Sequence, residues 1–117
     1  IGGSIFCIGQ DSANRLMWAV NGRYVPGASS TLVPENVWIH LVGTYDGTAA
    51  RLYLNGELIH TDTLGAITDD PTNNKMGIGG TAHVYANRFT DGPISNVRIY
   101  NHALSPSEIN LLFDKGR

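Results

Sequence analysis

The chain has 117 residues, which is long enough for one domain with its own hydrophobic core and too short for two. Its formal net charge of -2, with 15% charged residues and no run of like charges, provides no basic surface and excludes a nucleic-acid-binding domain. No apolar run approaches the roughly 20 residues that a membrane-spanning helix needs, so we expect no membrane insertion.

The beginning of the chain is predicted to form two strands and a short return strand. Ser4–Ile8 and Leu16–Val20 are apolar runs of strand length, and the residues from Gly9 to Asn14 between them are rich in turn formers. Asn21-Gly22 favours a tight hairpin turn because both residues tolerate positive φ. Arg23–Val25 would then be the returning strand.

Residues 37–62 are predicted to form a β-meander around which the rest of the domain is built. The first strand runs from Trp38 to Tyr45 and is largely apolar on both faces, which indicates a central position in a sheet. Asp46-Gly47 and Asn55-Gly56 favour tight hairpins. The segments between and after them, Arg51–Asn55 and Glu57–Thr63, are therefore predicted as the next two strands.

The last third of the chain is predicted to contribute two more strands. Lys75–Gly80 is a short, glycine-rich strand, and residues 81–90 form a long loop without a clear period. In Ile94–Tyr100 the apolar Val97 and Ile99 alternate with polar residues, as in a strand at a sheet surface.

One helix is predicted at the C-terminal end. Ser105 is a favourable N-cap, Pro106 suits the first helical position, and Glu108 completes a capping box. Gly116 provides a stop signal. The helix should be about two turns long and lay its apolar face on the rest of the domain.

Two blocks of the sequence follow a recognisable pattern. The first is WIHLVGTYDG at 38–47 with LYLNG at 52–56, and the second is DGPISNVRIYNHALS at 91–105. They resemble the W-x-H-x-x-x-T-Y-D-G…L-Y-x-[DN]-G signature and the closing segment of laminin-G-like, concanavalin A-like domains. The resemblance implies an all-β, two-sheet antiparallel β-sandwich of jelly-roll type with a short C-terminal helix, formed by residues 1–117 as a single domain. It also implies that Trp38 packs in the core.

The resemblance also implies that the domain lacks the first strands of the family, because family members begin with strands ahead of this chain's first one. Ser4–Ile8 and Ile94–Tyr100 would then lie at an open edge, and an open apolar edge pairs readily with another chain. We therefore expect either a fragment of a longer protein or a homo-oligomer, most simply a two-fold dimer. Alternatively, residues 66–74 or 81–90 fold over the gap.

Catalytic motifs are missing from the sequence. Some relatives of this fold class are glucanases with an E-x-D-x-[x]-E strand, but here Glu35, Glu57 and Glu108 are far apart in the chain. No G-x-S-x-G nucleophile elbow occurs. We therefore expect a non-catalytic domain, with a glycan-active enzyme as the less favoured alternative.

A calcium ion is often held in the loops of the family, where carboxylate and carbonyl oxygens suit a hard cation. This sequence has Ser95 where the family commonly has aspartate. Asp69, Asp70 and Asp91 remain as candidate oxygen ligands, but solvated turn residues are the simpler interpretation. The four histidines lack metal-ligand spacing, and a structural hydrogen bond is expected for His40. We expect no cofactor and no metal.

The resemblance implies a recognition module for a glycan or a protein, at the cell surface or outside the cell. Glycan binding requires exposed aromatic faces surrounded by amide or charged groups. The residues that meet this description are Tyr85, Arg88, Asn87, Trp18, Asn73 and Asn74. Trp18 is also part of an apolar alternation typical of a core strand, so both roles stay open. A protein-interaction or structural domain of a larger protein is the alternative function.

Overall fold

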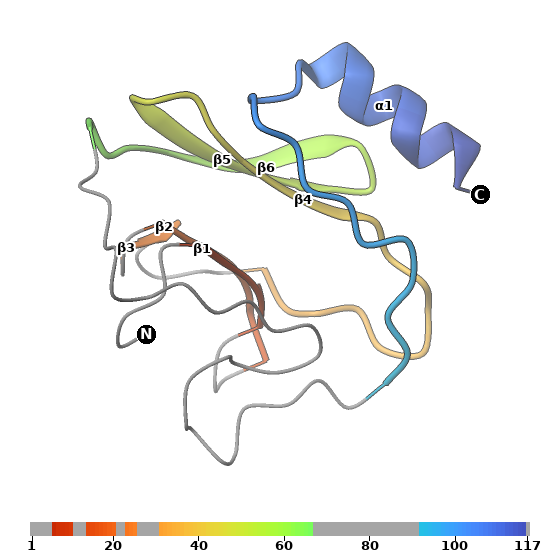
Figure 1. The fold of residues 1–117 in the computed structure, drawn as a ribbon. Coiled ribbons are helices and arrows are strands. Elements are labelled where there is room, and N and C mark those ends of the chain that lie inside the picture. The colour runs from red at the N-terminus through yellow and green to blue at the C-terminus, as the bar shows by residue number, and fades with distance from the viewer. Residues whose placement is uncertain (1–5, 11–13, 21–22, 26–30, 67–91, 117) are drawn as a thin grey trace.

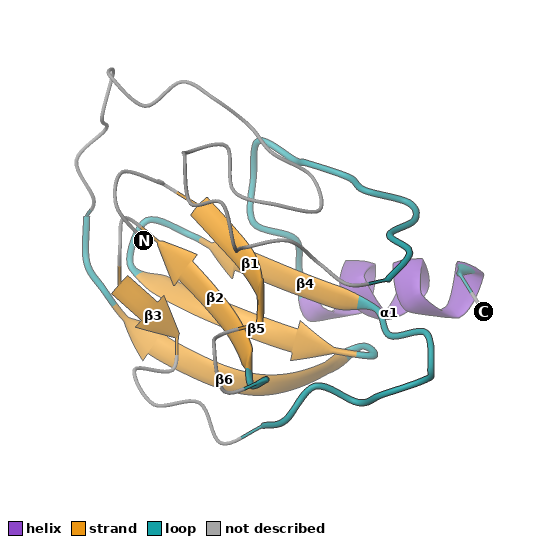
Figure 2. Ribbon diagram, turned by 90° about the horizontal axis from the view of Figure 1, so that it is seen from below, coloured by secondary structure: helices purple, strands orange, loops and turns teal. Residues whose placement is uncertain are grey.

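The computed structural model describes residues 6–10, 14–20, 23–25, 31–66 and 92–116. These residues form two three-stranded antiparallel sheets and one helix (Figures 1 and 2). The first sheet has the order β1-β2-β3 and the second β4-β5-β6. The strands are β1 Phe6–Gln10, β2 Leu16–Val20, β3 Arg23–Val25, β4 Leu41–Tyr45, β5 Ala49–Leu54 and β6 Glu57–Thr63, and the helix is α1 Pro106–Lys115. The mostly β, antiparallel class with one C-terminal helix is therefore confirmed.

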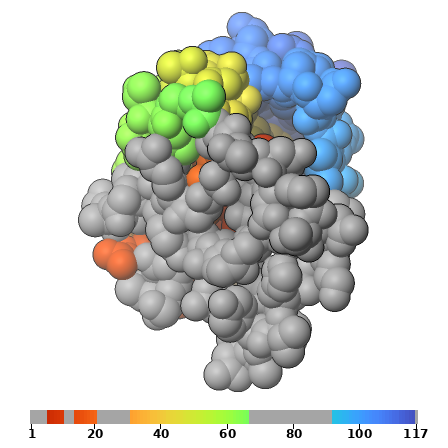
Figure 3. Space-filling model, turned by 60° about the vertical axis from the view of Figure 1, so that its left-hand side comes forward, coloured from red at the N-terminus to blue at the C-terminus, as the bar shows by residue number. Residues whose placement is uncertain are grey.

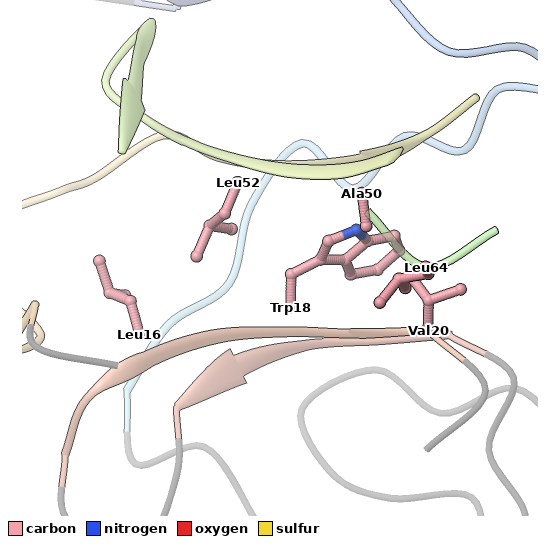
Figure 4. Packing of buried hydrophobic residues seen from close by; sticks show 6 residues of the cluster. All are labelled: Leu16, Trp18, Val20, Ala50, Leu52 and Leu64. Atoms are coloured by element: carbon pink, nitrogen blue, oxygen red, sulfur yellow. The ribbon is translucent and has the colours of Figure 1, made fainter. Parts of the chain in front are cut away.

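The core lies between the two sheets (Figure 4). Leu16, Trp18 and Val20 alternate along β2 and point towards the second sheet, where Ala50 and Leu52 of β5 meet them. Every residue of β2 is buried. The apolar run at 16–20 thus forms the central strand of its sheet, covered on both faces, which explains why it lacks a polar side.

A glycine in β4 makes room for the largest core side chain. A Cβ atom added at Gly43 would lie 2.6 and 2.7 Å from Cε3 and Cε2 of the Trp18 ring, well inside van der Waals contact. The indole therefore lies directly on the backbone of β4, and the two sheets approach closely at this point.

The hairpin turns of the second sheet follow the predicted chemistry. Asn55 and Gly56 both have positive φ, at 51° and 80°. The Asp46 carboxylate accepts hydrogen bonds from the backbone N–H groups of Ala49 and Thr48 and from Arg51 Nη1. These hydrogen bonds lower the pKa of Asp46 to about 2, and the bond from Ala49 has the largest effect.

The C-terminal helix packs on the outer face of the second sheet, opposite the first sheet (Figure 1). Ser105 and Glu108 form the predicted capping box, with reciprocal bonds of 3.2 and 3.0 Å. Ile109 is fully buried, and the ring of Phe113 lies 5.9 Å from that of His40. In Figure 3 the blue C-terminal residues lie against the yellow residues of the second sheet. At 10 residues the helix has about three turns, one more than expected.

Three predicted strands have different bounds in the structure, and the one predicted at Arg51–Asn55 is Ala49–Leu54. The first strand is Phe6–Gln10 instead of Ser4–Ile8, of which residues 4 and 5 lie outside the described residues. The first strand of the meander begins at Leu41 instead of Trp38, and the chain bends at residues 35–37 ahead of it. The predicted strand Lys75–Gly80 lies outside the described residues.

The strand predicted at Ile94–Tyr100 is wrong. Residues 92–100, which we call the closing segment, are all exposed and none is assigned to a strand. Asn96 has a φ of 55°, which interrupts the extended alternation. Among the described residues no backbone hydrogen bond joins this segment to another. The sequence has strand propensity here, but no neighbouring strand pairs with it in the described part of the chain.

Candidate ligand-binding surface

One segment, residues 31–40, crosses from the first sheet to the second, and we call it the bridging segment. At its beginning the Leu16 N–H donates to the Thr31 carbonyl and the Val33 N–H donates to the Asn14 carbonyl, each at 2.8 Å. Leu32 also forms an isolated antiparallel bridge with Arg15. This end of the bridging segment is therefore attached to the chain that enters β2.

The other end of the bridging segment is attached to the second sheet. The His40 N–H donates to Asn55 Oδ1, and the Asn55 N–H donates to the His40 carbonyl, both at 2.8 Å. Asn55 thus closes the β5–β6 turn with its backbone and holds the entry to β4 with its side chain. Backbone hydrogen bonds at both ends fix where the residues between them lie.

The middle of the bridging segment turns its side chains outward. Val33 and Ile39 pack against the core, and the four residues Glu35, Asn36, Val37 and Trp38 between them are exposed. Asn36 has a φ of 59° and lies in the middle of the bend at residues 35–37. We call these four exposed residues the Trp38 surface.

Trp38 is the main chemical feature of this surface because its side chain is 68% exposed. An indole ring presents a flat apolar face with a polarised N–H at its edge, which suits a ligand with both C–H groups and hydroxyls. Glu35 and Asn36 add a carboxylate and an amide within three residues, both exposed. These groups can accept and donate hydrogen bonds around a ring that stacks on Trp38.

His40 lies at the inner end of the Trp38 surface. Burial of the ring, and then the nearby charge of Arg98, lower the pKa of His40 below its usual value. Among the described residues its Nδ1 atom is buried without a hydrogen-bond partner.

The packing role expected for Trp38 is therefore wrong. The expectation came from the family resemblance, but in this structure β4 begins only at Leu41 and Trp38 lies ahead of it. Pro34 and Asn36 are turn formers placed shortly before the tryptophan, and that local signal could have separated Trp38 from the strand.

The residues predicted to bind a ligand are not brought together in the described structure. Trp18 is buried in the core at 7% exposure, so its ring faces are covered and it offers no stacking surface. The other predicted ligand-binding residues lie outside the described residues, namely Tyr85, Arg88, Asn87, Asn73 and Asn74.

The candidate calcium ligands Asp69, Asp70 and Asp91 also lie outside the described residues. Within the part of the chain that the structure describes, no three His, Cys, Asp or Glu side chains are grouped so that they could hold a metal ion. The same residues contain no helix that is long and apolar enough to cross a membrane.

Comparisons with known proteins define the class. A laminin G family model described as the concanavalin A-like lectin/glucanases superfamily matches residues 2–110. The chain belongs to this superfamily, as the two sequence blocks indicated. No curated protein sequence matches the chain.

A solved structure with a similar fold is an S-layer domain-containing protein (residues 221–444) from Clostridium thermocellum. The TM-score is 0.61 and the sequence identity is 23%. The similarity covers 94% of this chain and 64% of that one, so this chain spans less than two thirds of the length of its structural relative. At this identity the similarity shows a shared fold.

Proposed function

We propose that the domain is a non-catalytic glycan-binding module of a cell-surface protein and that the Trp38 surface is its ligand-binding site. The superfamily takes its name from lectins and glucanases, which act on carbohydrates. The S-layer relative suggests a location at the cell surface. The proposal includes completion of the two sheets into a jelly roll by residues outside the described ranges.

The observation that carries this proposal is the exposure of Trp38 on a segment anchored at both ends. Leaving so large an apolar face in water is unfavourable by about 25 cal/mol per Å², and a stacked sugar ring would remove part of it from water. Because the hydrogen bonds at Thr31, Val33 and His40 already hold the segment, little conformational entropy is lost on binding.

A protein partner is the second candidate, and a specific observation favours it. Leu32 and Val37 are also strongly exposed on the bridging segment, and Val37 directly precedes Trp38. A protein partner would cover these apolar side chains as well as Trp38, whereas a sugar ring would stack on Trp38 alone.

A glycan-array screen of the parent and of Trp38→Ala separates these candidates. We expect the parent to bind a defined group of glycans and the variant to bind them at least tenfold more weakly. Leu111→Ala on α1 is the matched control, because Leu111 is an exposed apolar residue far from the bridging segment in sequence. Equal glycan binding by Trp38→Ala and the parent, or no glycan binding by the folded parent, would refute the proposed site.

The non-catalytic part of the proposal rests on the absence of glucanase and hydrolase motifs from the sequence. Incubation of the protein with each glycan it binds, followed by chromatography of the products, tests it. We expect the glycans to be recovered intact. Release of smaller sugars in proportion to protein concentration would identify an enzyme instead.

A further inference from the structure

His40 fixes the inner end of the Trp38 surface to the second sheet. Its backbone N–H donates to Asn55 Oδ1 and its carbonyl accepts from the Asn55 N–H, both at 2.8 Å. Ile39, the one residue between His40 and Trp38, packs against the core. Each residue has only two freely rotating backbone bonds, so the place of the His40 backbone restricts where the Trp38 ring can lie.

The ring of His40 lies where a proton is poorly accommodated. α1 places the ring of Phe113 against it, with the two centroids 5.9 Å apart and the ring planes tilted by 35°. Its Nδ1 atom is buried, and no described residue forms a hydrogen bond with it. In the neutral imidazole Nδ1 can be the nitrogen without a proton, but in the charged form both nitrogens carry one. Protonation would therefore bury a charged donor without an acceptor.

The charges near the ring also oppose protonation. Burial and then the charge of Arg98 lower the pKa of His40 below its usual value. The other charged residues of the elements beside the ring are not among these causes, namely Glu108, Asp114 and Lys115 of α1 and Glu57 of β6. Within the described part of the chain, no carboxylate therefore offsets a positive charge on His40.

His60 provides a contrast at the other end of the bridging segment. Its Nε2 atom lies 3.1 Å from the hydroxyl oxygen of Thr31. A hydroxyl can donate to a neutral imidazole and can accept from a protonated one. The contact between His60 and Thr31 is therefore compatible with both charge states, whereas the buried Nδ1 of His40 suits only the neutral state.

We propose that His40 is a pH-sensitive switch for the Trp38 surface, in which protonation turns the ring away from Phe113 towards water, loosens the Asn55 anchor and weakens glycan binding. The regulation rests on the proposed function, because it acts on the same glycan site. By linkage, a glycan bound at the Trp38 surface reduces the proton affinity of His40 by the same factor. A glycan held at neutral pH is then released by mild acidification, in the range where histidine ordinarily titrates.

Fluorine NMR of the protein labelled with fluorotryptophan tests the coupling without a ligand. The resonance of Trp38 is identified by its loss in Trp38→Phe. We expect this resonance to shift and to narrow, as the side chain becomes more mobile, between about pH 7.5 and about pH 5.5. His40→Gln should remove both changes, and His60→Gln, the matched control, should keep them. Circular dichroism at both pH values checks that each variant is folded.

A Trp38 resonance that keeps its width across this pH range would overturn the inference. So would equal narrowing in His40→Gln and the parent, because the titrating group would then be a different one. Both results are obtained without a glycan, so they are independent of the proposed function.

A glycan array repeated at both pH values tests the effect on binding. We expect the parent to bind its glycans at least about threefold more weakly at about pH 5.5 than at about pH 7.5, and His40→Gln to bind equally at both. Binding by the parent that does not change with pH would overturn the inference and leave the proposed site standing. A parent that binds no glycan at either pH would refute the proposed function, and the fluorine resonance would then decide whether His40 controls the Trp38 surface.

Discussion

The indole N–H of Trp18 donates a hydrogen bond to the backbone carbonyl of Thr44, 3.0 Å away on the opposite sheet. Without this bond a buried donor would be left unpaired, at a cost of roughly 1–3 kcal/mol. The tryptophan therefore does more than fill the core. It joins β2 to β4 by a directional contact, and its ring lies on the Gly43 backbone beside that contact.

Gly43→Ala should destabilise the protein by about 1–3 kcal/mol, because a methyl group at this position overlaps the Trp18 ring and the core must shift. Urea unfolding measures the loss. Thr48→Ala, an exposed position in the same hairpin, is the control and should stay within about 0.5 kcal/mol of the parent. In the Trp18→Phe background the smaller ring should make Gly43→Ala less damaging, and strictly additive effects would argue against the contact.

The two tryptophans should have opposite fluorescence behaviour, because Trp18 is buried and Trp38 is exposed. In Trp38→Phe the remaining emission should be blue-shifted and poorly quenched by acrylamide. In Trp18→Phe it should be red-shifted and readily quenched. Similar quenching in both variants would mean that Trp38 is covered in solution.

Acidification should weaken the protein through His40. Burial and then the charge of Arg98 lower the pKa of His40 in the folded state below its ordinary value of 6.5, so the unfolded chain binds the proton more readily. The free energy of unfolding therefore rises with pH in this range. The contribution of His40 is fully present above the pKa of the unfolded chain and is lost progressively as the pH falls below that value. Melting from about pH 7.5 to about pH 5 should show a smaller decline for His40→Gln than for the parent. His102→Gln, an exposed position, should decline as the parent does.

The C-terminal helix should depend on its cap. Ser105→Ala removes the hydrogen bond that the hydroxyl accepts from the Glu108 N–H and should reduce stability by about 1 kcal/mol. Glu108→Ala should have a smaller effect. Ser107→Ala, two residues after the N-cap, is the control. A Ser105→Ala variant as stable as the parent in urea would show that the cap contributes nothing to the whole domain.

Calcium should have little influence on stability. We expect no specific calcium site, because Ser95 replaces an aspartate that is common in the family and the region loses a charge. Thermal melting with millimolar calcium should match melting with chelator. A rise of several degrees with calcium would demonstrate a site through linkage and contradict this expectation.

The features that could be predicted from the sequence are those determined by neighbouring residues. The Asn55-Gly56 turn requires two positive φ values that these residues tolerate, and the Ser105 capping box requires only residues three apart. β2 was predicted to the residue because an apolar run between turn formers admits few alternatives. For the same reason the family resemblance was found correctly, since its motifs are concentrated in these local features.

The features that could not be predicted depend on what lies beside a segment in space. Ile94–Tyr100 has the composition of a strand, but a strand also requires a partner, and sequence does not reveal its absence. A tryptophan is often a core residue, but Trp38 follows the bend at 35–37, lies outside the sheet and is exposed. Of the predicted site residues only Trp18 lies within the described structure, and its burial follows from its central strand.

The residues of the bridging segment have two separate roles. Thr31, Val33, Ile39 and His40 hold the two sheets, whereas positions 35–38 face solvent and, within the described part of the chain, add no side chain to the core cluster. Changes at Glu35, Val37 and Trp38 therefore alter the surface chemistry without altering the frame, whereas position 36 needs a residue that tolerates positive φ. A library randomised at 35, 37 and 38 would present many different short surfaces on one constant scaffold, in the way that variable loops do on an immunoglobulin sandwich.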